Sequence, residues 1–278
     1  MDGLPCRGPG VRALGLPLPP APMPRVQGTR PLKRWRYVGL FGPELQLCAG
    51  DARVGPLAVR WWAVAEPGRP LVERTSVIAS GGVAIGERRL EARARDGAIA
   101  LELEPAGEPV EVVSPSGQRW IWTRKTPIRA RGSVTVAGRR RDVELPGLVD
   151  ESAGYHARVT RWRWSAGAGT TEDGRAVWWN LVSGVHDAPR ASERTVWVDG
   201  AAQEVGPVEF TPALDGIRAA GGEGELRFAE WSARESRLNV GVFRNVYRQP
   251  FGAFEGTLPG GLRLASGHGV MEAHEARW

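Results

Sequence analysis

Residues 269–278, "GVMEAHEARW", gather carboxyl, imidazole and indole groups that are suited to acid–base chemistry. Side chains of a strand alternate between its two faces. The face that would carry Glu272 then consists of His268, Val270, Glu272, His274, Ala276 and Trp278. An apolar pocket would raise the pKa of Glu272 and let it donate a proton near neutral pH, with His274 orienting it or accepting a proton. The alternative is a strand whose charges form salt bridges, Glu275 with Arg277 and Glu272 with an inner arginine.

Two further stretches, "GYHARVTRWRWSAGAG" and "WWNLVSGVHDAP", combine tryptophan with polar groups. If extended, Trp162 and Trp164 share a face and form an indole wall that suits an apolar ligand or a developing cation. Polar residues at strand ends commonly surround the mouths of barrel pockets. The candidate catalytic residues are Glu272, His274, Tyr155, His156, His186 and Asp187. The candidate ligand-binding residues are Trp162, Trp164, Trp178, Asn180, Trp120, His268 and Trp278.

Each of these assignments has a structural alternative. Buried indoles commonly fill the cores of β proteins, and an aspartate before proline commonly caps a turn, as Asp187 would. A metal site built from His268, Glu272 and His274 lacks the H-E-x-x-H spacing and has no cysteine nearby, so we expect no metal and no cofactor. "GGVAIG" has no phosphate-loop lysine, and Ser183 lies in no nucleophile elbow, which removes nucleotide binding and serine hydrolysis.

The elements that would position these residues are strands. Short runs of β-branched, aromatic and leucine residues are separated by Gly, Pro and Asp-Gly signals. In "GAIALELEP" (97–105) the apolar residues alternate with glutamates, and "GSVTVAGRRRDVE" and "ERTVWVDGAAQEVGPVEF" are typical of hairpins. We therefore predict an all-β protein of two β-barrel or sandwich domains packed together, with few short helices.

The domain boundaries follow from composition. Residues 1–28 carry seven prolines and five glycines, which predicts an extended segment that does not pack. We read "ELPGLVDESAG" (144–154) as a connector bounded by Pro and Gly. The prediction is an N-terminal β domain over 29–147 and a tryptophan-rich C-terminal β domain over 148–278.

Charge and cysteine content limit the partners and the compartment. The formal net charge is +6, but the basic residues are scattered and nearly all arginine, with only "RPLKRWR" (30–36) and "GRRRD" (138–142) clustered. We interpret them as a solvated surface and expect no nucleic-acid partner. Two cysteines form no disulfide framework, and neither a signal peptide nor a transmembrane segment is recognised. We expect a cytoplasmic protein, and leave contact with a membrane surface open.

Several segments together resemble one bacterial protein family. They are "LPLPPAPMP", "KRWRYVGLFGPEL", "GLVDESAGYHARVTRWRWSAGAG", "WNLVSGVHDAP", "SERTVWVDG", "YRQPFGAFEGTLPGG" and the terminal "GVMEAHEARW", whose E-x-H-x-A-R-W ending is the most specific. From about Leu16 to Trp278 the chain resembles the domain-of-unknown-function family numbered twenty-eight zero four. More remotely, that family is similar in architecture to the double lipocalin-like barrels of carotenoid hydratases and tocopherol cyclases. The remote similarity implies protonation of an isoprenoid alkene inside a barrel, at the level of fold rather than of aligned residues.

The residues and the resemblance leave three functions open. The first is a cofactor-independent hydratase, cyclase or isomerase that acts on a lipid or isoprenoid by acid–base chemistry. The second is a carrier that binds a small hydrophobic molecule in the same pocket without catalysis. The third, a carbohydrate-binding module, requires tryptophans on an exposed face. The direction in which the last strand faces decides whether Glu272 and His274 lie in a pocket or at a salt-bridged edge, and both an enzyme and a carrier remain open for an inward-facing strand.

Overall fold

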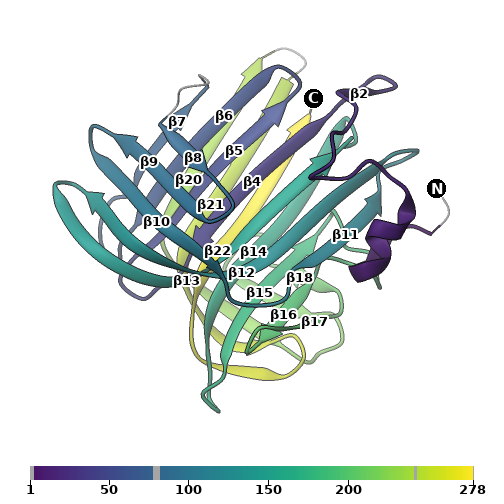
Figure 1. Ribbon diagram of the computed structural model, residues 1–278. Helices are drawn as coiled ribbons and strands as arrows, with labels where there is room; N and C mark the ends of the chain where they lie inside the picture. The colour runs from purple at the N-terminus through teal and green to yellow at the C-terminus, as the bar shows by residue number, and fades with distance from the viewer. Residues whose placement is uncertain (1–2, 78–81, 241–242, 278) are drawn as a thin grey trace.

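The chain folds into two large antiparallel sheets, each curled around its own core (Figure 1). The structure is a computed structural model that describes residues 3–77, 82–240 and 243–277. Within these ranges the only helix is the short 3-10 helix η1 (Gly8–Leu14). The prediction of a two-part, lipocalin-like all-β fold with few short helices is confirmed.

The first sheet is formed by the N-terminal half of the chain. Its hydrogen-bonded path is β7 (Val72–Ser76), β6 (Leu57–Ala65), β5 (Gln46–Val54), β4 (Lys33–Leu40), β13 (Arg139–Gly154), β12 (Trp120–Val136), β10 (Gly97–Pro105), β9 (Arg89–Ala94) and β8 (Val83–Ile85). Beside this path, β11 (Val110–Pro115) pairs with β12 and with β1 (Cys6–Arg7). Strands β2 (Val26–Gln27) and β3 (Arg30–Pro31) form a separate hairpin.

The second sheet is formed by the C-terminal half. Its path is β17 (Ala201–Glu204), β16 (Thr195–Val198), β15 (Ala176–Ser183), β14 (Val159–Thr171), β22 (Leu262–Arg277), β21 (Phe243–Leu258), β20 (Glu225–Val240), β19 (Gly216–Ala219) and β18 (Val208–Phe210). The terminal strand β22 thus lies in the middle of this sheet, between β14 and β21. Its backbone is paired on both sides, which fixes the register of the residues it carries.

Local patterning predicted the hairpins well. In β10 the side chains of Ile99, Leu101 and Leu103 are buried, whereas Glu102 and Glu104 are exposed. The β12–β13 turn has positive φ at Ala137 and Gly138, and the β16–β17 turn has it at Asp199 and Gly200. Such backbone angles match the twist of two-residue hairpin turns.

The boundary of the first sheet differs from the connector predicted at 144–154. These residues belong to β13, which continues without a break across 147–148 and pairs with β12 and β4. Gly147 is required by a close backbone approach rather than by a turn, because a Cβ atom there would lie 2.2 Å from the carbonyl oxygen of Gly39. The chain passes to the second sheet after Gly154, between β13 and β14.

The N-terminal segment also differs from the prediction, because it packs. Val11 and Leu18 are fully or almost fully buried, in a cluster with Trp120, Trp122 and Tyr155. In Figure 1 this segment, drawn in purple, lies beside β11. The prolines remove backbone donors but leave the interspersed apolar side chains free to cover the indoles.

A third core joins the two sheets. It includes Tyr37 and Leu148 from the first sheet with Trp164, Trp178 and Phe251 from the second. Consequently β15 is buried on both faces, with Trp178 directed to the interface and Trp179 to the core of the second sheet. The Gln46 amide nitrogen also donates to the carbonyl of Gly252 across the interface at 2.7 Å.

We expect Gly50→Ala to disturb this interface. Gly50 lies opposite Trp61 in the β5–β6 pair, and a Cβ atom would lie 2.1 Å from the indole Cζ2. Displacing the indole should lower the free energy of unfolding by about 1–3 kcal/mol, as overpacking does. Denaturant unfolding measures this, with Gly221→Ala as control, where no atom lies within 4 Å of the new Cβ. Equal, small effects would contradict the tight packing of Trp61.

Candidate functional site

A cavity of about 170 Å³ lies between the two sheets. The first sheet contributes side chains from β4, β5, β6, β12 and β13, and the second from β14, β15, β21 and β22. The linkers after β13 and after β15 add one histidine each. Its ionisable, aromatic and hydroxyl-bearing lining residues are Lys33, Arg34, Trp35, Tyr37, Arg53, Trp61, Thr123, Lys125, Asp150, Ser152, His156, Thr160, Trp162, Trp164, His186, Glu193, Tyr247, Glu272 and His274.

Strand β22 turns its Glu272–His274 face toward this cavity. Glu272 lies opposite Trp164, and His274 lies opposite Trp162, in the β14–β22 pair. Residues directly opposite one another in antiparallel strands share a face. All four side chains line the cavity, so the two sequence motifs that were 110 residues apart form one wall.

Among the described residues, the Glu272 carboxyl group forms hydrogen bonds but no salt bridge. Its Oε1 accepts a hydrogen bond from the Trp162 indole nitrogen at 2.7 Å, and its Oε2 accepts one from the Gln249 amide nitrogen at 3.1 Å. Burial raises the pKa of Glu272 to about 7, which the hydrogen bonds from Trp162 and Tyr247 only partly oppose. About half of the Glu272 carboxyl groups therefore carry a proton at pH 7.

His274 is a neutral imidazole beside this acid. Its Nε2 lies 2.6 Å from the Asn245 amide oxygen, which can only accept, so Nε2 carries the proton and Nδ1 keeps its lone pair. The ring lies against Trp162, with centroids 4.2 Å apart. Burial, with the nearby Lys33 charge, lowers the pKa of His274 to about 4. The acid Glu272 and the base His274 thus both contact the Trp162 indole.

His156 and His186, two further candidate catalytic residues, also line the cavity. Burial lowers the pKa of both, to about 3 for His186 and well below the ordinary value for His156. Nδ1 of His186 lies 2.8 Å from the Ser114 hydroxyl oxygen. Both rings are therefore uncharged at neutral pH.

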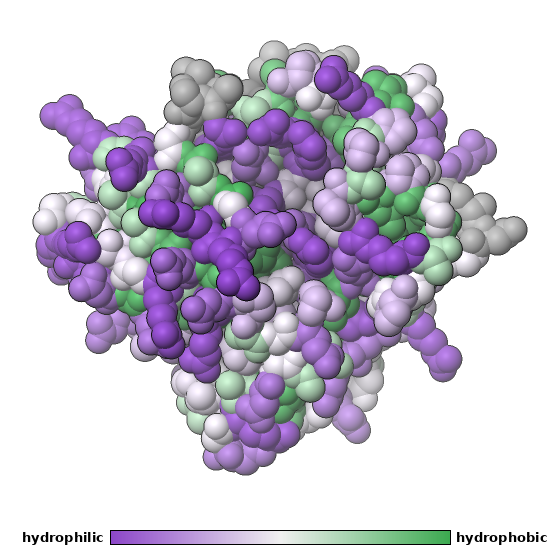
Figure 2. Space-filling model, in the orientation of Figure 1, coloured by the Kyte–Doolittle hydropathy of each residue, from purple (hydrophilic) through white to green (hydrophobic). Residues whose placement is uncertain are grey.

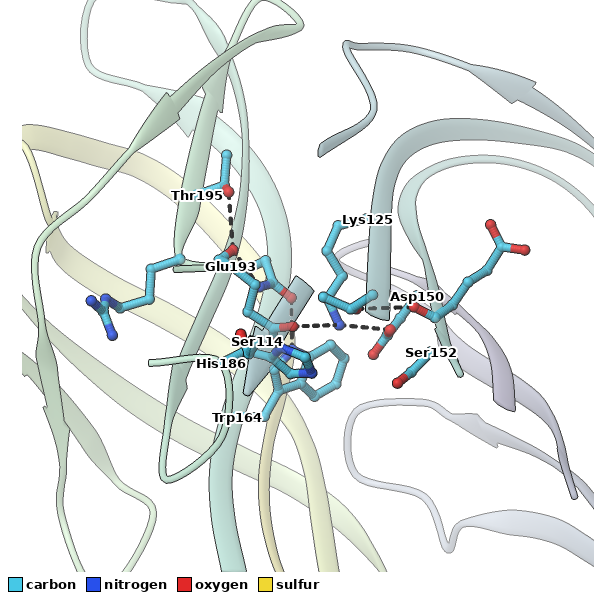
Figure 3. A network of polar contacts seen from close by, with 12 residues as sticks. Ser114, Lys125, Asp150, Ser152, Trp164, His186, Glu193 and Thr195 are labelled. Atoms are coloured by element: carbon cyan, nitrogen blue, oxygen red, sulfur yellow. Dashed lines mark hydrogen bonds and ion pairs between the residues drawn. The ribbon is translucent and has the colours of Figure 1, made fainter. Parts of the chain in front are cut away.

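A buried charge network, which no sequence motif indicated, lies in the same cavity (Figure 3). The Lys125 ammonium lies 2.6 Å from Asp150 Oδ1 and 3.4 Å from Glu193 Oε2, and all three side chains are almost fully buried. Burial alone would lower the pKa of Lys125, but the two carboxylates outweigh it and raise that pKa. Burial also raises the pKa of Asp150. The negative charge of Asp150 in turn helps to raise the pKa of Glu272.

One sequence signal could have located this network. Lys33 and Lys125 are the chain's two lysines among many arginines, and both line the cavity. Lys33 belongs to the cluster that we interpreted as a solvated surface, yet its side chain is only 3% exposed. Burial lowers its pKa to about 7, a change that an ammonium undergoes more readily than a guanidinium.

Two of the candidate catalytic residues lie outside the cavity. Tyr155 is buried under the N-terminal segment, where its hydroxyl donates to the carbonyl of Pro24 at 2.8 Å. Asp187 is exposed, and its carboxylate accepts a hydrogen bond from the backbone of Gly184 at 2.7 Å, as a turn cap does. Each is adjacent in sequence to a histidine that lines the cavity.

Several candidate ligand-binding residues also lie elsewhere. Trp178 fills the core between the sheets, and Trp120 packs against Tyr155. Asn180 contacts two residues that line the cavity. Its amide oxygen accepts a hydrogen bond from the Trp164 indole nitrogen at 2.7 Å, and its amide nitrogen donates to the backbone carbonyl of Glu193. His268 shares the face of Glu272 but contacts Trp231 away from the cavity. Trp278 lies outside the described residues.

The described residues contain neither a cluster suited to a metal ion nor a helix suited to crossing a membrane. No group of three or more His, Cys, Asp and Glu side chains is arranged to hold a metal ion within residues 3–77, 82–240 and 243–277. In the same ranges no helix has the length and apolar character needed to span a membrane. On the face shown in Figure 2, hydrophilic residues are spread between small hydrophobic patches.

Comparison with solved structures supports the fold. A protein of Nitrosomonas europaea described as AttH aligns over 94% of this chain and 98% of its own, with 15% identity and a TM-score of 0.60. Kievitone hydratase from Nectria haematococca aligns over 88% of each chain, with 12% identity and a TM-score of 0.54. At these identities the likeness shows the shared fold alone. Among curated proteins the sequence has no match.

The family itself is shown by sequence. A family model described as domain of unknown function, DUF2804, matches residues 74–278, which is most of the chain. The matched region includes strands β12–β15, β21 and β22 of the cavity wall. The chain therefore belongs to the DUF2804 family.

Proposed function

We propose that this protein is a cofactor-independent hydratase, cyclase or isomerase that protonates a carbon–carbon double bond of a small, largely apolar lipid or isoprenoid. The observation that carries the proposal is Glu272, a buried carboxyl group with a pKa of about 7 on the wall of a cavity lined by indoles. A carboxyl group with such a pKa can hold a proton at neutral pH and still release it. The fold shared with an enzyme named as a hydratase agrees with this chemistry.

Groups that line the cavity can supply and accept every proton of the proposed reaction. Glu272 transfers its proton to one alkene carbon, which forms a C–H bond and leaves a carboxylate and a carbocation. The indoles of Trp162 and Trp164 line the cavity with Glu272 and would stabilise the cation. Water or a hydroxyl group of the substrate then forms a C–O bond, and its proton passes to the Glu272 carboxylate or to Nδ1 of His274. In an isomerisation the cation instead loses a carbon-bound proton to the Glu272 carboxylate or to Nδ1 of His274, and the C–H electron pair forms the new double bond.

The second candidate, a carrier, would use the same cavity without a reaction. The two functions differ in what Glu272 does, because a carrier needs only the cavity's shape and its polar contacts. A carbohydrate platform has less support, since every tryptophan in the described ranges is buried or half-buried.

Organic extraction of the protein purified from its native host, followed by mass spectrometry, tests the proposal. We expect an apolar compound to accompany both wild type and Glu272→Gln, as product in the former and as unreacted substrate in the latter. The same unchanged molecule in both would favour a carrier. No bound compound in either would contradict an apolar-ligand cavity.

A further inference from the structure

Most polar side chains that line the cavity are already satisfied by the protein. The hydroxyl of Thr123 donates to the carbonyl of Glu151 at 2.9 Å, and that of Ser152 donates to the carbonyl of Trp122 at 3.1 Å. The Thr160 hydroxyl donates to the carbonyl of Ala157 at 3.1 Å. These groups fix the walls and have no free donor for a ligand.

His156 differs from them. Its side chain is 4% exposed and lines the cavity, yet neither ring nitrogen has a hydrogen-bond partner of normal geometry among the described residues. Trp35 lies against the face of the ring at a centroid distance of 5.1 Å, and the backbone of Gly154 lies close enough to act on its pKa. Buried polar groups are almost always paired, so a cavity-lining ring without a well-formed hydrogen bond indicates that a ligand supplies a partner.

His186 offers a third free nitrogen from a different segment. Its Nδ1 is occupied by Ser114, whereas Nε2 has no partner within the described part of the chain. Its backbone is in the left-handed region, with φ of 52°, and the backbone nitrogen of Glu193 donates to its carbonyl at 3.0 Å. Both rings line the same cavity. The loop therefore brings a second imidazole to the cavity that His156 lines.

The charges around these rings favour a neutral ligand group. Lys125 is balanced by Asp150 and Glu193, burial lowers the pKa of the lining Lys33 to about 7, and the lining arginines, Arg34 and Arg53, are exposed. A neutral imidazole has one donor and one acceptor. A hydroxyl group has the same pair of functions, so two neutral imidazoles can bind one hydroxyl by donating to it and accepting from it.

We propose that His156 and His186 form a hydroxyl-binding subsite, and that the ligand is an apolar molecule that carries a neutral hydroxyl group as a phenol, enol or alcohol. This inference rests on the proposed function in taking the cavity as the substrate site, and it narrows the substrate from apolar molecules in general to hydroxylated ones. It concerns binding, so it can be tested without turnover.

The cavity volume guides the choice of probe. An engineered protein cavity of about 150 Å³ holds benzene. A cavity of about 170 Å³ that opens toward exposed arginines accommodates a molecule of one or two rings. 2-Naphthol and naphthalene therefore form a suitable pair, since they differ by the hydroxyl group alone.

Calorimetric titration of wild type with both probes is the test. We expect 2-naphthol to bind at least about tenfold more tightly than naphthalene, because only the naphthol satisfies the imidazoles. His156→Phe keeps a ring but removes its nitrogens, and should reduce this preference to less than about threefold. His268→Phe, at a histidine outside the cavity, should leave it unchanged. Equal affinities in wild type, no binding of either probe, or tighter binding of 2-naphthoate than of 2-naphthol would overturn the subsite.

A spectroscopic measurement on wild type covers the case in which His156→Phe does not fold. Only four histidines occur in the chain, so their ring nitrogens can be followed by NMR after ¹⁵N labelling. 2-Naphthol should shift the ring signals of His156 and His186 and leave His268 unmoved, and the opposite pattern would overturn the proposal. Failure of the proposed function is a separate result: Glu272→Gln would then process the co-purifying compound as wild type does, with the naphthol preference intact.

Discussion

Glu272→Gln should lower kcat for the co-purifying substrate by about 100-fold or more, while the Kd for 2-naphthol changes little. The amide has the shape of the acid but cannot donate the proton that starts the reaction, and general acid catalysis contributes about 10²–10⁴-fold. Trp162 can still donate to the amide oxygen. Gln249 can rotate its amide so that its Oε1, which has no hydrogen-bond partner among the described residues, accepts from the new side chain.

The pH dependence of wild-type kcat/KM should identify the same group. The proposed reaction requires protonated Glu272 and neutral His274, whose pKa values are about 7 and about 4. The rate should therefore fall about tenfold per pH unit above pH 7 and fall again below about pH 4. A profile that is flat from pH 6 to 9 would show that Glu272 is not the acid.

Stability provides a check that needs no substrate. The pKa of Glu272 is raised from 4.5 in the unfolded chain to about 7 in the fold, so ionisation of the buried group costs about 3 kcal/mol at pH 8. That cost is absent below pH 4.5 and develops as the pH rises to 7. Glu272→Gln should consequently gain stability relative to wild type between pH 4 and pH 8, as measured by denaturant unfolding.

The neighbouring Glu275 supplies the matched control for both measurements. It lies on the opposite face of β22, where it pairs with Arg161, whose side chain is 70% exposed. Glu275→Gln should leave turnover unchanged and alter stability by less than about 1 kcal/mol. Equal effects of the two variants on turnover would remove the special role of the cavity-facing carboxyl.

Lys125→Met should destabilise the protein by about 3–5 kcal/mol, because it leaves Asp150 and Glu193 buried without their cation. The deficit should be largest at neutral and alkaline pH. It should shrink at acid pH, because burial raises the pKa of Asp150, which becomes protonated there and no longer needs a counter-charge. Circular dichroism during denaturant unfolding, at pH 4 and pH 8, measures both effects.

An exposed ion pair of the same sheet supplies the control for this variant. Arg131 and Glu144 are 3.0 Å apart, with side chains 60% and 51% exposed. Arg131→Met should cost less than about 1 kcal/mol at either pH. Replacing Asp150 and Glu193 by their amides in the Lys125→Met background should restore part of the loss. If Lys125→Met cost no more than Arg131→Met, water would have to reach the network.

The sequence by itself determined the properties that depend on neighbouring residues. The period of two in β10 and β22, and the glycine turns of the hairpins, specified strands and which side chains share a face. The pairing of Glu272 and His274 on one face and of Trp162 with Trp164 on another followed from this. Local sequence was less informative at Gly147, where a glycine that permits close strand contact resembles one that ends a strand.

Only the tertiary structure decided which faces meet. The cavity combines Lys125 and Asp150 of the first sheet with Glu193 and Glu272 of the second, and no spacing along the chain encodes that contact. Trp120 and Trp162 have similar local patterns, yet the N-terminal segment covers the former and the cavity exposes the latter. The physical reason is that alternation fixes the side of a strand, whereas strand order and sheet packing fix what lies on that side.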